Sequence, residues 1–489
     1  MRRPLLLGLG VVVAVAAFQL WISPHNPPGF FRDEAAIAYN AHTISTDGRD
    51  EYGARLPLYF SSFQDYKSPI FVYGLAGVFS LTGPDREVAR GFAATCILGA
   101  ILLLGWLAYR RTARASVGVA TIVLAGTTPW LFELGRVAFE VALEPLFLCL
   151  VLLFVERASR LDRWGPVSAV PVSLTLGAVT YVYAGGRLLA PLLALALAAV
   201  IGRERWKWVA TAWAGFALTQ IPLLLYTRAH PGALSRRYDA TTFVTDDMPF
   251  WEIAWRGAVN YLQDLQLWHY VVSGDPKPYA HTPGTSALLA VSVALSVAGL
   301  ALVLARFRGD PFWRYSVAAL LVTPIPAAAT IDRFHAVRLA PLVVMLVVVS
   351  IPALAYLREQ VVRARWARAL AVTLGVLAAV QLAAFVHAYR SDGPLRTGRF
   401  EAGVPGLLAR AWADGGTVYV DYDDLEPLAL SRWYALEQGI EQARVVRLPD
   451  GGIPPTGSTA FGRTQECDYV CERIAEASDY WIARVVGPR

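Results

Sequence analysis

Long apolar blocks dominate this chain, and short polar segments separate them. A bilayer core about 30 Å thick needs roughly 20 apolar residues per helix. The pattern predicts eleven membrane-spanning segments, at 4–22, 88–109, 115–132, 141–156, 166–183, 187–202, 207–226, 284–305, 312–330, 337–357 and 366–389. Because lipid does not tolerate unpaired backbone groups, we expect each segment to be α-helical.

Basic residues predict the orientation of these segments. Clusters rich in arginine occupy every second loop, as expected for cytoplasmic loops. This places the N-terminus inside and the C-terminus outside. The apolar segment 69–83 is only 15 residues long, and a crossing there would invert every later loop. We therefore predict a juxtamembrane or re-entrant helix within a first outer loop, 23–87. The clusters are 110–114, 157–163, 203–207, 306–308 and 358–368.

The first apolar block follows Met-Arg-Arg, as in a signal peptide. The block is long, however, and WISPHNPP does not match the small-residue pattern of a cleavage site. We predict an uncleaved first transmembrane helix.

The composition fits a membrane protein. Hydrophobic residues make up 55%, charged residues 17%, and the mean hydropathy is +0.43. The net charge of +6 does not indicate nucleic-acid binding, because the arginines lie in short loops between apolar helices. The predicted location is the cytoplasmic (inner) membrane, with several crossings.

The tail differs in composition from the rest. Strands are predicted at 417–422, 443–448 and 479–485, with a helix at 426–438. We expect a transmembrane domain, 1–389, and a small extracytoplasmic α/β domain, 390–489. Cys96 and Cys149 lie in apolar segments and are predicted packing residues, whereas Cys467 and Cys471 could pair in an oxidising compartment.

The first outer loop carries two adjacent acids, Asp33 and Glu34, and a lone lysine, Lys67. An ionised carboxylate can accept a proton from an acceptor hydroxyl. The alternative is that the acids stabilise the N-terminus of the helix that follows them.

Three charged residues, Arg136, Glu140 and Glu144, follow at spacings of four. This spacing predicts one helix face near the outer side of the membrane. The two carboxylates could face the acids of the first loop, although a salt bridge between Arg136 and Glu140 is the alternative that the spacing favours.

Further cations are predicted on the outer side: Lys67, Arg187, His335 and Arg338. Arginine and lysine are common phosphate ligands. One such residue alone would be explained by snorkelling, but four on the side poor in Lys and Arg suit a phosphate-bearing lipid head.

The outer loop 227–283 contains Asp275 and His281, which could contact a sugar. Its aromatic residues could stack on sugar rings or form an interfacial belt, and the belt is favoured. They are Trp251, Trp255, Tyr261, Trp268 and Tyr270.

In the tail, Asp421, Asp423 and Asp424 could hold a divalent ion, although a polar turn is favoured. The sequence contains no phosphate-binding loop, dinucleotide glycine fingerprint, Cys/His zinc spacing or G-x-S-x-G motif.

Six segments carry a family resemblance: FFRDEAAIAYNA (30–41), DYKSPIFVY (65–73), GRVAFEVALEP (135–145), TYVYAGGRLLAPLL (180–193), the 260–284 segment with SGDPKPYAHTPG, and DRFHAVRLAPL (332–342). Together they resemble the GT-C superfamily of membrane glycosyltransferases that use polyprenyl-phosphate donors. The branch they resemble contains bacterial protein O-mannosyltransferase-like and aminoarabinose-transferase-like enzymes.

The resemblance implies a role for each candidate. Asp33 would be the catalytic base beside Glu34, and Glu140 or Glu144 would be a second acid. Binding of the lipid phosphate and the sugar would fall to Lys67, Arg136, Tyr183, Arg187, Asp275, His281, His335 and Arg338. Some branches use a divalent metal ion, so a metal is possible and no other cofactor is implied.

We therefore expect an all-α polytopic membrane protein of GT-C fold with about 11 transmembrane helices. Its predicted activity is inverting transfer of a hexosyl or pentosyl group from a polyprenyl-phosphate donor to a glycan, lipid or protein hydroxyl, with the active site facing the extracytoplasmic side. The alternatives are a transporter or flippase of a lipid-linked sugar and a non-catalytic scaffold that presents the C-terminal domain. Charges at helix ends and the absence of paired halves disfavour transport.

Overall fold

The computed structural model describes residues 2–23, 25–63, 65–161, 165–202, 205–413, 415–421, 425–463 and 469–487. The chain divides into two compact units. Unit 1 comprises Met1–Trp21, Ala93–Arg136 and Glu140–Ala388, and unit 2 comprises Ile22–Phe92, Val137–Phe139 and Tyr389–Arg489. One boundary between the units lies at residues 388–389, and the first outer loop falls in the same unit as the tail.

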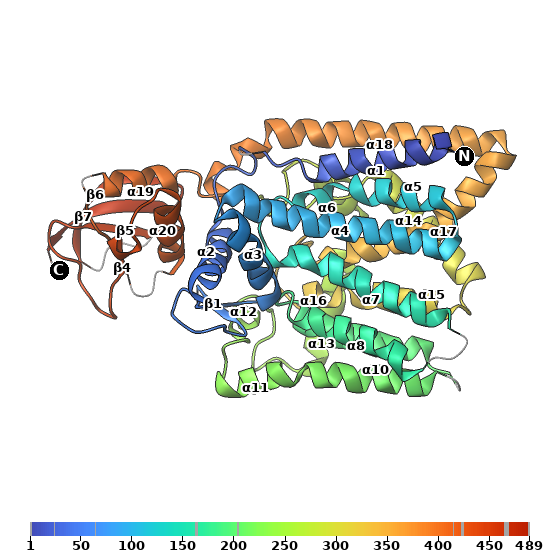
Figure 1. Cartoon of the computed structure of the whole chain (residues 1–489), viewed down its shortest axis with the longest axis horizontal. Helices are drawn as coiled ribbons and strands as arrows, with labels where there is room; N and C mark the ends of the chain where they lie inside the picture. Colours follow the sequence, from blue (N-terminus) through green and yellow to red (C-terminus); the bar gives the residue numbers. More distant parts are fainter. Residues whose placement is uncertain are drawn as a thin grey trace. The chain divides into compact units, whose positions relative to one another are not determined.

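Unit 1 is a bundle of helices. Figure 1 shows α7, α8 and α10 side by side, and α14 packs along α17. Its elements are α1 (Arg2–Gln19), most of α4 (Arg86–Thr112), α5 (Ala115–Gly126), α6 (Pro129–Leu134), the 3-10 turn η1 (Glu140–Leu143), α7 (Glu144–Ser159), α8 (Pro166–Thr180), α9 (Gly186–Ala196), η2 (Leu197–Val200), α10 (Trp206–Thr219), α11 (Ile221–Ala229), α12 (Arg236–Asp239), α13 (Phe250–Asp264), the π-helical turn η3 (His269–Ser273), α14 (Ala290–Arg306), α15 (Pro311–Val322), α16 (Ile325–Ala328), α17 (Ala340–Arg363) and most of α18 (Arg365–Ser391).

Every predicted span contains a helix, but prolines divide several of them. Pro129 lacks an N–H and starts α6, so the predicted segment 115–132 is two helices, not one. Pro222 similarly lies at the start of α11 and separates it from α10. Sequence hydropathy detects the apolar block and misses the break, because proline counts as a mildly polar residue rather than as a helix terminator.

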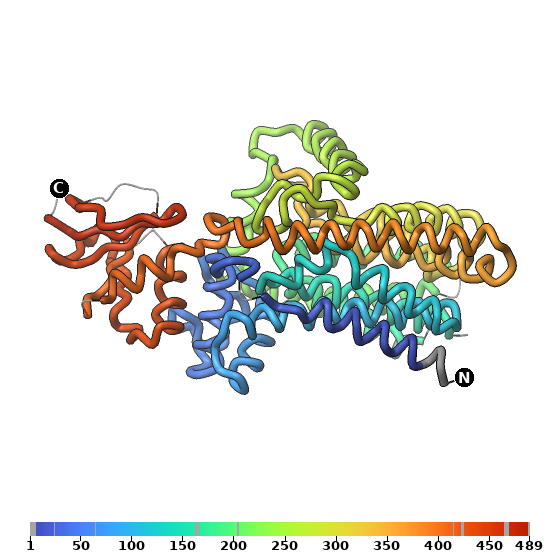
Figure 2. The backbone as a smooth tube through the Cα atoms, turned by 90° about the horizontal axis from the view of Figure 1, so that it is seen from above, coloured from blue at the N-terminus to red at the C-terminus, as the bar shows by residue number. Residues whose placement is uncertain are grey.

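Four helical segments in the described parts of the chain are long and apolar enough to cross a membrane. They are Arg86–Thr112, Trp206–Ala229 (α10 and α11 taken together), Ala340–Arg363 and Arg365–Leu395. The last segment follows α17 after a turn at residue 364, visible where the tube reverses in Figure 2. Only 6% of its most apolar stretch is buried within the protein. The other apolar helices are shorter, so the count of about 11 crossings stays a prediction.

Close backbone contact fixes the packing of α14 on α17. A Cβ added at Gly299 would lie 2.0 Å from the carbonyl oxygen of Val349, so a side chain there would separate the two helices. The start of the neighbouring helix α15 is also set locally, because the Asp310 side chain accepts a hydrogen bond from the Phe312 N–H and Pro311 occupies the first helical position.

Unit 2 combines the first outer loop with the tail. The loop contributes α2 (Arg32–Asp47), the hairpin β1 (Phe60–Ser62) and β2 (Asp65–Lys67), and α3 (Pro69–Thr82). The predicted helix at 69–83 is thus α3, which packs on α2. The tail contributes the short 3-10 turns η4 (Gly393–Leu395), η5 (Thr397–Arg399) and η6 (Gln442–Arg444), α19 (Val404–Trp412), β3 (Val418–Val420), α20 (Leu425–Glu437), β4 (Val445–Arg447), β5 (Thr459–Arg463), β6 (Val470–Ala477) and β7 (Tyr480–Gly487).

The tail strands form one mixed sheet in the order β4-β3-β5-β7-β6. β3 is parallel to β4 and β5, whereas β7 is antiparallel to β5 and β6. α19 packs on β6 and β7, and α20 packs on β3, β4 and β5, next to the sheet in Figure 1. The three predicted strands and the predicted helix are confirmed, while β5, β6 and α19 were not predicted.

Candidate active site

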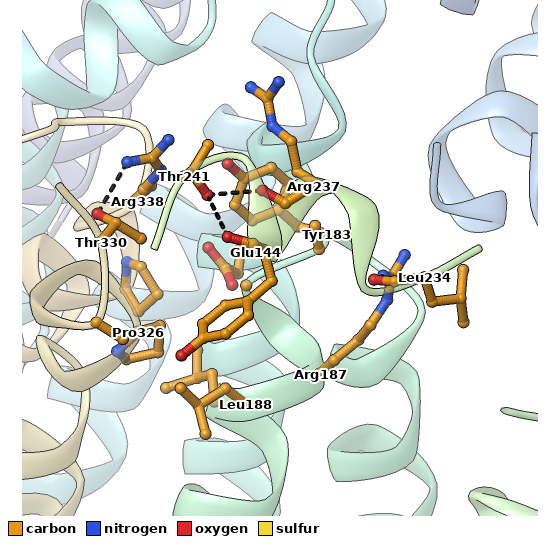
Figure 3. Close-up of a pocket in the computed structure, with 16 residues that line it drawn as sticks. Glu144, Tyr183, Arg187, Leu188, Leu234, Arg237, Thr241, Pro326, Thr330 and Arg338 are labelled. Atoms are coloured by element: carbon orange, nitrogen blue, oxygen red, sulfur yellow. Dashed lines mark hydrogen bonds between the residues drawn. The ribbon is translucent and has the colours of Figure 1, made fainter. Parts of the chain in front are cut away.

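A cavity of about 370 Å³ lies in unit 1 and contains several of the predicted residues (Figure 3). Its polar lining consists of one carboxylate, three arginines, two tyrosines and two threonines, and leucines, alanines, prolines and a glycine form the rest of its wall. The lining residues are Glu144, Tyr183, Ala184, Gly185, Arg187, Leu188, Leu189, Leu234, Arg237, Tyr238, Thr241, Pro326, Ala329, Thr330, Arg338 and Pro341.

Helix ends and short connections bring these side chains together. Glu144 is the first residue of α7, directly after η1. Tyr183 lies in the connection between α8 and α9, and Arg187 lies in the first turn of α9. Arg237 belongs to α12 and Arg338 to the segment just before α17. Polar groups at helix ends can face a cavity without interrupting the apolar helix bodies.

The Glu144 carboxylate is the most unusual group in this lining. The residue is 2% exposed, and its Oε2 atom has no hydrogen-bond partner within the described parts of the chain. Burial of an unsatisfied carboxylate oxygen is costly, and protein structures rarely retain one without a reason. Figure 3 shows Glu144 beside Tyr183 in the cavity. The group is therefore suited to accept a hydrogen bond from a ligand.

The arginines are held by neighbouring acceptors. Arg187 Nη1 donates to the carbonyl of Leu234 at 2.8 Å. Arg338 Nη1 donates to Thr330 Oγ1 at 2.8 Å and to Asp332 Oδ2 at 2.9 Å. Such contacts orient the planar guanidinium groups, which bind phosphate oxygens through paired N–H donors.

A buried polar cluster supports the segment that carries Arg338. Asp275 accepts hydrogen bonds from the backbone N–H groups of Lys277 and Ala336, at 2.8 and 2.5 Å. His335 lies 3.4 Å from the same carboxylate through Nδ1, and its Nε2 is 2.9 Å from the Tyr279 hydroxyl. Asp275 and His335 therefore fix the turn before Arg338 and do not belong to the cavity lining that the structure describes.

His281 lies in a second buried cluster. Its Nδ1 contacts Glu133, and its Nε2 is 2.9 Å from the Thr285 carbonyl. Burial lowers the pKa of His281, but the Glu133 carboxylate outweighs that effect, so the pKa is raised. Glu133 also accepts from the backbone N–H and the hydroxyl of Thr282, both at 2.6 Å. These bonds hold the end of the 227–283 loop.

In unit 2, Asp33 and Lys67 form an ion pair. Asp33 is the second residue of α2, and Lys67 is the last residue of β2. The lysine side chain is 7% exposed and the Asp33 side chain 24%, with a second carboxylate, Asp65, 3.8 Å from Lys67 Nζ. The Lys67 ammonium group therefore contacts the Asp33 carboxylate, part of which stays accessible.

Glu34 has different surroundings from Asp33. It is fully buried and accepts two hydrogen bonds from Arg90, at 2.9 and 2.8 Å. The backbone N–H groups of Phe31 and Ala138 donate to it at 3.0 and 2.9 Å. Four donors occupy its two oxygens, so this geometry suits a residue that holds the start of α2 rather than one that receives a proton.

The residues at 136–144 do not share one helix face, contrary to expectation. A turn after α6 carries Arg136, which donates to the Gln19 carbonyl and lies over the Phe132 ring at 4.1 Å. Glu140 begins η1 and is buried. Gly135 ends α6, and Pro145 occupies the first turn of α7, so a single helix cannot run through this segment.

No protein-family model and no curated protein matches the sequence. Solved structures do match the fold. ArnT from Cupriavidus metallidurans bound to undecaprenyl phosphate has a TM-score of 0.61, at 12% identity over 99% of each chain. The apo state of ArnT gives 0.58 at 13% identity, again over 99% of each chain. The chain has the GT-C fold. An Archaeoglobus fulgidus oligosaccharyltransferase in complex with Zn and sulfate gives 0.53 at 13% identity, over 87% of this chain and 61% of that one.

The fold and the long apolar helices support a membrane location. Four residues predicted from the sequence line the cavity: Glu144, Tyr183, Arg187 and Arg338. Arg237 was missed. Its position in the outer loop 227–283, on the side poor in Lys and Arg, is a signal that could have grouped it with the other two arginines.

The aromatic residues of the 227–283 loop lie mostly on the surface of unit 1. Trp251, Trp255 and Trp268 are 69%, 66% and 62% exposed, and none of them is among the cavity residues that the structure describes. The Tyr261 hydroxyl donates to the Leu321 carbonyl, and Tyr270 is buried. This distribution favours an interfacial belt over stacking on a sugar ring.

Metal ligands were expected as one possibility. Within the described ranges, no group of three or more His, Cys, Asp and Glu side chains could hold a metal ion. Asp423, Asp424 and Cys467 lie outside the described residues. Cys471 is disulfide-bonded, whereas Cys96 and Cys149 are buried thiols in the apolar helices.

Proposed function

We propose that this protein is a glycosyltransferase that transfers a sugar from a polyprenyl-phosphate donor to an acceptor hydroxyl, with inversion at the anomeric carbon. The observation that carries the proposal is the arginine-lined cavity in a chain with the GT-C fold. A structure of this fold, matched over 99% of its length, is bound to undecaprenyl phosphate.

The composition of the cavity suits the head of such a donor. Arg187, Arg237 and Arg338 provide positive charge for a phosphate, and Leu188 and Pro341 provide an apolar wall for the first isoprene units. A volume of about 370 Å³ fits a sugar phosphate head and lies within the usual range of ligand pockets.

In the proposed reaction, the acceptor oxygen attacks the anomeric carbon as the bond from that carbon to the phosphate oxygen breaks. The electron pair of the broken bond leaves with polyprenyl phosphate, whose negative charge the arginines stabilise. Asp33 receives the proton of the acceptor hydroxyl. The role of Asp33 rests on the family resemblance and on its contacts within its own unit, where it pairs with Lys67.

Glu144 is the proposed second acid of the site. The family resemblance left Glu140 and Glu144 as alternatives, and only Glu144 is among the described lining residues of the cavity. Its unsatisfied Oε2 would accept a hydrogen bond from a sugar hydroxyl. Glu34, Asp275, His281 and His335 are proposed as positioning residues because their polar atoms contact protein groups.

The proposed location is the inner membrane, with the site on the extracytoplasmic side. The alternating arginine clusters support this orientation, and the disulfide at Cys471 suits an oxidising compartment. A GT-C neighbour binds zinc, but the described residues of this chain offer no matching ligand group, and no step is assigned to a metal ion.

The test is transfer of radiolabelled mannose from polyprenyl-phosphate-mannose by membranes that contain the protein, followed by a panel of other polyprenyl-phosphate sugars. We expect transfer by the wild type and a loss of at least about 100-fold for Asp33→Asn. Arg308→Met, on an exposed residue of a predicted cytoplasmic loop, is the matched control. A wild type that is inert with every donor would refute the proposal, and a fully active Asp33→Asn would remove Asp33 from the mechanism.

A further inference from the structure

A turn at the start of the tail holds the N-terminus of α2. The Glu401 carboxylate accepts a hydrogen bond from the backbone N–H of Arg32 at 2.7 Å and another from Arg32 Nη1 at 2.9 Å. The Tyr480 hydroxyl donates to the same carboxylate at 3.2 Å. The first N–H groups of a helix have no partner within the helix. Here a residue 369 positions away in the sequence supplies one.

The backbone around Glu401 is shaped for this contact. Glu401 has a φ of +54°, a conformation that residues other than glycine seldom adopt. Gly29 lies opposite, and a Cβ added there would come within 2.3 Å of the Phe400 carbonyl oxygen and 2.7 Å of Ala402 Cα. The turn at 400–402 can approach the start of α2 only because residue 29 has no side chain.

A second carboxylate of the tail, Glu426, also contacts Arg32. The Arg32 Nε atom is 3.2 Å from Glu426 Oε1, and Arg463 pairs with the other oxygen of Glu426. Glu401 is 2% exposed and its pair with Arg32 is largely shielded from solvent, so salt would screen this network weakly.

The position of this network matters because Asp33 follows Arg32 directly. Arg32 and Asp33 are the first two residues of α2, and Glu34 fixes the next position through its four donors. Whatever holds Arg32 also sets the direction in which the Asp33 side chain leaves the helix towards Lys67.

We propose that Glu401 is a positioning residue for Asp33, and that the tail therefore belongs to the catalytic machinery rather than only to acceptor selection. This inference rests on the proposed function for its catalytic consequence, while the contact itself can be tested without any activity.

The structural test is hydrogen–deuterium exchange of the full-length protein, read on peptides that cover residues 27–38. We expect the amides in the first turn of α2 to exchange at least about tenfold faster in Glu401→Ala than in the wild type. The exchange rate in Glu401→Gln should lie between those of the wild type and Glu401→Ala, because the glutamine amide oxygen can still accept a hydrogen bond from the Arg32 N–H. The matched control is Glu437→Ala, which removes the half-exposed pair of Glu437 with Arg86 elsewhere in the same unit. Equal exchange in Glu401→Ala and Glu437→Ala would overturn the inference.

The kinetic test uses sugar transfer. We expect Glu401→Ala to lower kcat by about 10- to 100-fold, the scale of a misplaced catalytic group, with the KM for the polyprenyl donor unchanged. In an Asp33→Glu background, where the carboxylate is already displaced, the further loss should be much smaller. If Glu401→Ala lowers kcat by the same factor in the Asp33→Glu background as in the wild type, the two residues act independently and the inference is overturned. A wild type without transfer would refute the proposed function alone, because the exchange experiment still decides the contact.

Discussion

Replacement of Glu144 by methionine is expected to make the protein more stable and less active. The side chain is buried, and its Oε2 atom has no partner among the residues that the structure describes. An unsatisfied buried polar group costs about 1–3 kcal/mol, and methionine removes this group while keeping an unbranched side chain of similar length. Glu144→Met should therefore raise the free energy of unfolding by an amount on that scale.

The same change should weaken the proposed contact with the donor. A hydrogen bond to a charged group contributes about 1.5–3 kcal/mol, so its loss corresponds to roughly a 10- to 150-fold decrease in kcat/KM. Opposite changes in stability and activity are characteristic of residues retained for function at a cost in stability.

Helix α7 provides a matched control at its other end. Glu156 is equally buried, but it pairs with Arg110 at 2.7 Å and with Arg160. Glu156→Met should lower stability, because two cations lose their carboxylate, and should leave transfer nearly unchanged. The measurements are the apparent melting temperature of the purified protein in nanodiscs and the transfer rate. A Glu144→Met variant that is less stable and fully active would refute the reasoning.

Three further predictions concern phosphate binding, the stability of unit 2 and the pH dependence of stability. Arg338→Met should raise the Kd for undecaprenyl phosphate by about 10-fold or more, since one charged donor is lost, and a change below about threefold would contradict the phosphate role. Glu34→Gln should destabilise unit 2 by about 3–5 kcal/mol because Arg90 loses its buried partner, and an unchanged apparent melting temperature would argue against that pair. Burial raises the pKa of Asp264 to about 6 and that of Glu401 to about 7. Both acids therefore bind protons more tightly in the folded chain, and stability should fall as the pH rises from about 4 to 7. Asp264→Asn and Glu401→Gln should each flatten this slope, and a slope of the opposite sign would contradict the assignment.

The sequence predicts the architecture well where a periodic pattern determines it. Each apolar block contains a helix, and strands β3 and β7 lie at two of the positions predicted from alternation. Hydropathy does not reveal where a helix breaks, as at Pro129. Hydropathy also does not reveal which distant segments pair, such as the partners of β5, because strand pairing depends on residues far apart in the sequence.

The candidate site, too, could be predicted only in part from the sequence. Charge on the outer side of the membrane singled out Arg187 and Arg338, which do share a cavity. Two neighbouring acids, Asp33 and Glu34, look equivalent in the sequence. Their difference depends on Arg90 and on two backbone N–H groups, and these groups meet Glu34 only in the folded chain.

The composition of unit 2 has a consequence for biosynthesis. Its first part ends at Phe92, and its last part begins at Tyr389. A ribosome adding roughly 5–20 residues per second needs some tens of seconds to cover the interval. During that time the start of α2 has neither Glu401 nor the sheet of the tail beside it. The nascent protein therefore inserts most of its membrane helices before the segment that bears Asp33 can reach its final conformation, so termination of translation shortly after α18 should yield an inserted bundle whose first outer loop never matures.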